Sequence, residues 1–144
     1  MSDKEVTKIL VDIATINKYM SNEENLKSMN NDTLSYTGLK LAAMKASLLD
    51  VKVDAHRDML KKEVLREKAK AEAYYKYKKE HGSTAAGDMK YMDEDFIKAQ
   101  EAYNESKVQF ERLKTLLTDT HDTLDMIKSR VIDQQGQRKD ERLK

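Results

Sequence analysis

The segment FIKAQEAYNESKVQFERLKTLLTDTHDTLDMIKSRV, residues 96–131, repeats its large apolar side chains every seven positions. One position of the repeat is apolar or aromatic six times in succession: Phe96, Tyr103, Phe110, Leu117, Leu124 and Val131. The other reads Ala99, Ser106, Leu113, Thr120, Ile127 and Gln134, half of them polar. Such a repeat is typical of a helix that packs on another helix. We therefore predict a long helix over residues 93–133, packed along a seam as a hairpin or coiled coil.

A second long helix is predicted ahead of it, over residues 33–81, with Asp32 or Thr33 as its cap. Gly82 supplies the glycine exit that commonly ends a helix, and Gly38 is the position where a kink is expected. Roughly 48 residues at 1.5 Å each span about 70 Å, longer than a compact domain of this size is wide. This helix therefore either bends back or projects into an assembly.

The remaining segments complete the predicted organisation. Residues 1–20 hold an N-terminal helix over 3–20, opened by Ser2 and Glu5 as a capping box. The Asn-rich residues 21–32 are predicted to connect the first two helices. Residues 82–92 are predicted to form a glycine-containing loop, and residues 134–144 a polar, frayed tail.

The composition fits an all-α protein. The 144 residues are 37% charged and include no proline, which favours long helices over sandwiches and barrels. We predict an antiparallel helical hairpin or coiled-coil-like bundle. Many helix surfaces cannot be buried in one small chain, so further copies of the chain are plausible partners.

No segment has the length or apolarity of a membrane span, and the N-terminus lacks the basic and apolar regions of a signal peptide. The chain has no cysteine, which excludes disulfides and thiolate chemistry. We expect a soluble, cytoplasmic protein without a membrane partner.

The sequence carries no catalytic pattern. It lacks the glycine-rich phosphate-binding motifs, and His56, His81 and His121 are too far apart for metal-ligand spacing. The acidic run Asp93-Glu94-Asp95 is better explained by a helix N-terminus, where negative charge opposes the helix dipole. We expect a protein that is not an enzyme and needs neither metal nor cofactor.

Charge is distributed in blocks, although the net charge is only +1. Residues 57–80 carry nine basic and five acidic groups, whereas residues 93–125 carry four and nine. On an ideal helix, Val53, Leu60, Val64 and Ala71 form one stripe, which we expect to be buried. Lys62, Arg66 and Lys70 lie on the opposite side, and Tyr77 projects there too.

Two interpretations of the basic side remain open. It is either an ordinary solvated face with ion pairs between successive turns, or a surface that neutralises phosphates while tyrosine stacks on bases. In either case Tyr74 and Tyr75 are expected at the rim of the core, and Tyr77 is the better stacking candidate.

The order of these features resembles the UvsY family of phage recombination mediators. The resemblance covers residues 35–131 and rests on a basic helix ending in Tyr74-Tyr75, an acidic glycine-containing loop, and the stretch Leu124-Asp125-Met126-Ile127-Lys128-Ser129-Arg130. Lys68 and Lys70 match the family's basic residues before the tyrosine pair with an offset of one position. The segment after Arg130 departs from the family.

The resemblance implies a non-enzymatic, homo-oligomeric ring that binds single-stranded DNA. It also implies that the protein helps to load a phage recombinase onto DNA covered by single-strand-binding protein, in the host cytoplasm. The DNA-binding residues would be Lys62, Arg66, Lys68, Lys70, Lys76, Tyr77, Lys78 and Lys79. The oligomerisation residues would be Phe96, Tyr103, Phe110, Leu113, Leu117, Leu124, Ile127 and Val131.

Two alternatives remain open at this point. The chain could be a coiled-coil structural or adaptor protein that uses its seam to bind another protein, with charge serving only solvation. A phage-encoded inhibitor of a host nuclease, suggested by the acidic block 93–125, is the third hypothesis.

Overall fold

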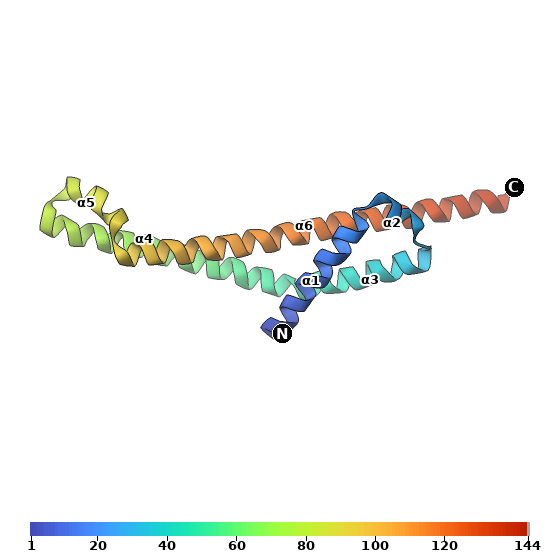
Figure 1. The fold of residues 1–144 in the computed structure, drawn as a ribbon, viewed down its shortest axis with the longest axis horizontal. Helices are drawn as coiled ribbons and strands as arrows, with labels where there is room; N and C mark the ends of the chain where they lie inside the picture. Colours follow the sequence, from blue (N-terminus) through green and yellow to red (C-terminus); the bar gives the residue numbers. More distant parts are fainter. Residues whose placement is uncertain (144) are drawn as a thin grey trace. The chain divides into compact units, whose positions relative to one another are not determined.

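The fold was described from a computed structural model, which covers residues 1–143; Lys144, the last residue of the predicted tail, lies outside the described residues. The described chain is all-α and contains no strand. Its elements are α1 (Asp3–Met20), α2 (Glu23–Ser28), α3 (Asn31–Ser47), α4 (Leu49–His81), α5 (Ser83–Met89), the 3₁₀ helix η1 (Lys90–Met92) and α6 (Glu94–Leu143) (Figure 1). The predicted all-α class is confirmed.

The chain divides into two compact units, which are described separately. The terminal unit contains residues 1–50 together with the described residues from Lys114 onward, and the middle unit contains residues 51–113. Helices α1, α2, α3 and the later part of α6 thus belong to the terminal unit. The middle unit holds nearly all of α4, then α5, η1 and the first part of α6.

The terminal unit has an aliphatic core. Its most deeply buried side chains are Ile13 and Met20 of α1, Leu34 and Leu41 of α3, and Leu48, all at most 2% exposed. Helix α6 contributes Leu117, Thr120, Thr123 and Ile127, each at most 5% exposed. Full burial of one such aliphatic side chain contributes about 1.5–3 kcal/mol. These residues therefore form the core of this unit.

The polar residues at the seam are buried with partners. Thr120 is fully buried; its hydroxyl donates to the Leu116 carbonyl at 2.7 Å and accepts from the Asn17 amide at 3.1 Å. The hydroxyl of Ser106, 4% exposed, donates to the Tyr103 carbonyl at 2.8 Å. Because their hydroxyls are paired, these polar residues fit inside the seam.

Asparagines delimit the helices between residues 20 and 31. The side chain of Asn22 caps α2, accepting from the Glu24 backbone N–H at 2.9 Å, and that of Asn30 caps α3, accepting from Thr33 N–H at 2.8 Å. The expected connection 21–32 therefore contains a short helix, and α3 starts before the predicted Asp32 or Thr33. The Asn-rich composition is explained by capping.

The predicted helix 33–81 is divided into α3 and α4, with the interruption at Leu48. There the backbone N–H bonds to the Lys45 carbonyl at 3.1 Å in a tighter turn, and α4 then begins at Leu49. Gly38 does not break the helix. A Cβ at Gly38 would lie 3.4 Å from Ile127 Cγ2, so this glycine lets α3 approach α6 closely.

The predicted loop 82–92 was wrong, because residues 83–92 form α5 and η1. In the described part of the predicted tail, α6 continues to Leu143. Only Gly82 makes a sharp exit, with φ of +85°, a conformation that side chains other than glycine rarely adopt. The alanines of the segment STAAGDM favour helix once Gly82 has turned the chain.

In the middle unit, α4 and α6 run antiparallel (Figure 1). The ring of His56 stacks on Phe110 with centroids 4.8 Å apart, and Arg66 lies over the ring of Tyr103. Tyr77 reaches Asp93 at the start of α6. As residue numbers rise along α4, those of the α6 partners fall, so this unit is a helical hairpin, as predicted.

The predicted orientation of α4 was wrong. Val53, Leu60 and Val64, expected to be buried, are 53%, 45% and 68% exposed, and Ala71 is exposed as well. The inward side carries the basic residues and Ala73, whose side chain is only 3% exposed. Long side chains such as Arg66 can cover aromatic rings with their stems, which lets a basic face turn inward.

In the described part of the chain, no helix is both long enough and apolar enough to cross a membrane.

Candidate nucleic-acid interface

The three basic residues predicted to lead DNA binding point toward the hairpin and have acidic partners. Lys62 pairs with Asp58 at 3.2 Å, while Arg66 and Lys70 pair with Glu67 at 3.0 and 3.8 Å. The Arg66 guanidinium also lies 4.2 Å from the centre of the Tyr103 ring, and its side chain is only 20% exposed. The ion pairs of Lys62, Arg66 and Lys70 lie within α4, whereas the contact of Arg66 with Tyr103 joins α4 to α6.

The Tyr77 side chain is half-buried and is held at the N-terminal end of α6. Its hydroxyl donates to Asp93 Oδ1 at 3.1 Å, and the other oxygen of Asp93 accepts from the Phe96 backbone N–H at 3.1 Å. The pKa of the Tyr77 phenol is raised, chiefly by this hydrogen bond, then by burial and by the Asp93 charge. Because Asp93 is 7% exposed and caps α6, Tyr77 joins the end of α4 to the start of α6.

Of the three tyrosines near the end of α4, Tyr75 is the exposed one, whereas Tyr74 and Tyr77 are half-buried. Tyr75, predicted at the rim of the core, is 63% exposed, and its ring meets half-buried Tyr74 edge-on with centroids 5.6 Å apart. Tyr75 is thus the tyrosine of α4 whose face is open to solvent. The helical projection placed Tyr77 there because it assumed that the aliphatic stripe points inward.

Lysines and tyrosines converge where α4, η1 and the start of α6 meet. Lys90 Nζ lies 5.7 Å from the Tyr74 ring centre and 5.0 Å from that of Tyr91. Lys78 Nζ lies 5.9 Å from Tyr74, and Lys70 Nζ lies 5.9 Å from Tyr91. We call this group, completed by Tyr75, the lysine–tyrosine cluster: Lys70, Tyr74, Tyr75, Lys78, Lys90 and Tyr91.

The cluster is accessible. Tyr75 and Tyr91 are 63% and 53% exposed, Lys78 is exposed and Lys90 is half-buried. Tyr91 also packs edge-on against Phe96, with centroids 5.8 Å apart, so its ring is supported from below. A supported, exposed ring beside lysine ammonium groups can stack on a base while a neighbouring cation contacts phosphate.

The predicted cations Lys68, Lys76, Lys78 and Lys79 remain on the outside of α4. Lys68 is 69% exposed with Glu72 at 3.9 Å, and Lys76 is 60% exposed with Asp93 at 3.8 Å. Lys78 and Lys79 are exposed on the last turn of α4, three and four residues after Tyr75. These four lysines add positive charge around the cluster.

Sequence reasoning missed Lys90 and Tyr91. Their signal was a second Lys-Tyr pair, MKYM at residues 89–92, beyond the Gly82 turn. This pair fell in the predicted loop 82–92, and the direction of a side chain cannot be predicted for an irregular loop. The short helices α5 and η1 bring this pair back toward Tyr74.

Four predicted oligomerisation residues are covered by the chain's own helices. Phe96, Leu113, Leu117 and Ile127 are 7%, 8%, 5% and 4% exposed. The remaining four are half-buried: Tyr103, Phe110, Leu124 and Val131. The seam therefore packs within one chain. The role of these residues in assembly stays a prediction.

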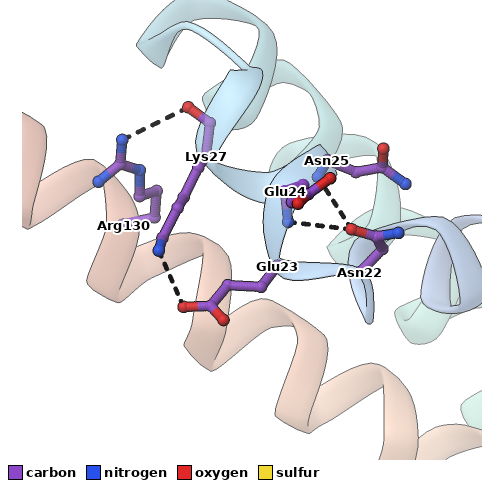
Figure 2. A network of polar contacts seen from close by, with 6 residues as sticks. All are labelled: Asn22, Glu23, Glu24, Asn25, Lys27 and Arg130. Carbon is purple, nitrogen blue, oxygen red and sulfur yellow. Dashed lines mark hydrogen bonds and ion pairs between the residues drawn. The ribbon is translucent and has the colours of Figure 1, made fainter.

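The LDMIKSR stretch is a packing element of the terminal unit. Ile127 packs near Gly38, and the Arg130 guanidinium donates to the Lys27 carbonyl of α2 at 3.4 Å (Figure 2). Lys27 also pairs with Glu23 at 3.1 Å, while Lys128 is exposed. Arg130 therefore helps to dock the C-terminal end of α2, where a carbonyl lacks a helical partner.

No group of three metal-ligating side chains occurs among residues 1–143. In the acidic run at residues 93–95, Asp93 serves as the cap of α6, which agrees with the explanation from the helix N-terminus.

Comparison with known proteins returned no match to a protein-family model, a curated protein or a solved structure.

Proposed function

We propose that the protein binds single-stranded nucleic acid, specifically DNA, through the lysine–tyrosine cluster of the middle unit. The observation that carries this proposal is the convergence of Lys70, Lys78 and Lys90 on Tyr74 and Tyr91, beside exposed Tyr75. Stacking on tyrosine together with lysine–phosphate contacts binds single strands without sequence preference. Duplex DNA hides its base faces, so the cluster would contact it through phosphate alone.

In this proposal, successive bases stack on the Tyr75 and Tyr91 rings. Lys78, Lys79 and Lys90 neutralise the adjoining phosphates, and binding releases the counterions that those phosphates held. Arg66 stacks on Tyr103 and helps to hold the hairpin that carries the cluster, and Lys70 reaches the edge of the cluster at Tyr91. Tyr77 and Asp93 fix the end of α4 against α6.

The wider role follows the resemblance to the UvsY family. The protein would act without catalysis in the cytoplasm of a phage-infected host, as an assembly of copies. It would help to load the phage recombinase onto DNA coated with single-strand-binding protein. A direct test is whether the protein shortens the lag in recombinase assembly on coated DNA, a lag that an inert protein would leave unchanged.

The binding site is tested by the salt dependence of oligonucleotide affinity. The triple variant Lys78→Gln, Lys79→Gln, Lys90→Gln should weaken binding and reduce the slope of log affinity against log salt by about 2, because each lost phosphate contact removes about 0.7. The matched control is Lys98→Gln, Lys107→Gln, Arg112→Gln, which removes the same charge from exposed positions of α6.

Failure of the proposed function and failure of the proposed site give different results. Negligible binding of the unmodified protein at low salt would contradict the proposed function. Binding that is equally weakened in both triple variants would retain the function but remove the cluster as its site.

A second function, an adaptor that binds another helix, is favoured by one specific observation. Val53, Leu60 and Val64 form an exposed aliphatic stripe on α4. The two functions use different surfaces, so an oligonucleotide titration separates them. An adaptor alone would show no salt-dependent DNA binding.

A further inference from the structure

The outer face of α4 is an apolar stripe with charged residues at regular intervals. At 100° per residue, Val53, Arg57, Leu60, Val64, Lys68 and Ala71 lie within about 80° of arc. All six are exposed, and the three large aliphatic residues are 53%, 45% and 68% exposed. Within the described chain, this stripe has the spacing of a helix-packing face but no helix packed on it.

The charges on this face are arranged so that they distinguish the two ways of pairing it with itself. Arg57 is 65% exposed in its side chain and Glu67, at the edge of the stripe, is 54% exposed. In a parallel pair, each residue would face its own copy, placing Arg57 against Arg57 and Glu67 against Glu67. Like charges in such positions oppose association.

In an antiparallel pair centred between Leu60 and Val64, apolar and charged residues match at the same time. Val53 then faces Ala71 of the second copy, Leu60 faces Val64, and Arg57 faces Glu67. Asp54 flanks the same seam within reach of Lys68. Like charges approach each other only beside the axis, between the two copies of Lys61 on one flank and the two copies of Glu63 on the other, where long side chains can extend into solvent.

We propose that α4 binds a second copy of this chain through this face, antiparallel and about a twofold axis between Leu60 and Val64. Because a twofold interface uses the same patch on both chains, each contact occurs twice. The proposal goes beyond DNA binding and does not depend on it. It also assigns assembly to α4, because the most buried residues of the α6 seam are covered within one chain.

The first test measures association by sedimentation at a series of protein concentrations. The unmodified protein should dimerise, and Val64→Lys should raise the dimer dissociation constant at least tenfold. The matched control is Val108→Lys on α6, which changes an apolar side chain of similar exposure (47%) outside the stripe and should leave the constant unchanged. A helical signal equal to that of the unmodified protein verifies that each variant is folded.

Charge exchange tests the register. Arg57→Glu and Glu67→Arg should each weaken the dimer at least tenfold by bringing like charges together. The double variant should recover most of that loss, because each pair is again opposite in sign. If the two substitutions weaken the dimer independently, so that the double variant recovers no affinity, the proposed register would be overturned.

Cross-linking tests the direction, since the chain has no cysteine of its own. An equimolar mixture of Val53→Cys and Ala71→Cys chains should form a mixed disulfide dimer under mild oxidation, whereas either variant alone should form little. Preferential cross-linking within each single variant would indicate a parallel pair and overturn the proposal. An unmodified protein that stays monomeric at every concentration, or that dimerises equally after Val64→Lys, would overturn it as well.

Discussion

The two units of this protein are packed in different ways. The terminal unit places Ile13, Leu34 and Leu41 fully inside and builds an aliphatic core. The middle unit leaves Val53 and Val64 outside and turns arginine, lysine and tyrosine inward. One unit is thus held by apolar burial, the other by aromatic stacking, ion pairs and a helix cap. The difference teaches that the unit with fewer fully buried apolar side chains is expected to open more readily.

The largest effect should come from the aliphatic core. Leu41→Ala should lower the free energy of unfolding by about 2–5 kcal/mol, through lost burial and the cavity that remains. Leu39→Ala is the control, since this neighbour is 73% exposed and should change the stability by less than about 0.5 kcal/mol. Denaturant unfolding followed by the helical signal measures both. Equal losses would mean that the terminal unit is not organised around this core.

The cap of α6 should be the strongest single contact of the middle unit. Asp93→Ala removes the acceptor of both Tyr77 and the Phe96 N–H, and should cost about 1–2 kcal/mol. The control is Asp95→Ala, an exposed carboxylate in the same turn. Hydrogen exchange of the α6 amides after Asp93 should accelerate only in the first variant. Unchanged exchange there would contradict the role of Asp93.

The turn between α4 and α5 offers a matched pair of glycines. Gly82→Ala should cost about 1 kcal/mol, because φ of +85° strains any residue with a Cβ. Gly87→Ala, within α5 and with no atom within 4 Å of an added Cβ, should instead stabilise the protein by about 0.5–1 kcal/mol. Thermal unfolding of the two variants should therefore shift in opposite directions. A shift in the same direction would contradict the distinction between turn and helix.

The smallest effect is expected from the Tyr77 phenol. Its pKa is raised in the folded protein, chiefly by the hydrogen bond to Asp93. This contribution to stability is thus fully present below about pH 10, the ordinary tyrosine pKa, and is lost as pH rises through the folded value. The decline of stability above pH 10 should become shallower in Tyr77→Phe. An unchanged decline would mean that other tyrosines cause it.

Local signals predicted local structure well. The Ser2–Glu5 capping box and the Gly82 exit are both present, and α1 has the bounds expected for residues 3–20. Each of these depends on residues within one turn of helix. The all-α class followed in the same way from composition and helical periodicity.

The direction of α4 could not be obtained from its own sequence. A stripe of Val53, Leu60 and Val64 normally points inward, but the facing part of α6 offers Tyr103 and Phe110, on which Arg66 and His56 can stack. Which face of α4 points inward therefore depends on both helices. Because the basic face points inward, Tyr77 is not at the exposed position predicted for stacking. Lys90 and Tyr91 were missed for the same reason, since α5 and η1 are what bring them to Tyr74.

The central claim is that exposed tyrosines of the middle unit stack on single-stranded DNA. The most direct measurement compares the affinity of a fluorescent oligothymidylate for Tyr75→Ala, Tyr91→Ala and Tyr36→Ala, the last a 69% exposed tyrosine of the terminal unit. Loss of one stacked base costs about 1–3 kcal/mol, so the first two variants should bind about 5- to 150-fold more weakly. Tyr36→Ala should bind as the unmodified protein does. Equal affinity in all three variants would contradict the claim.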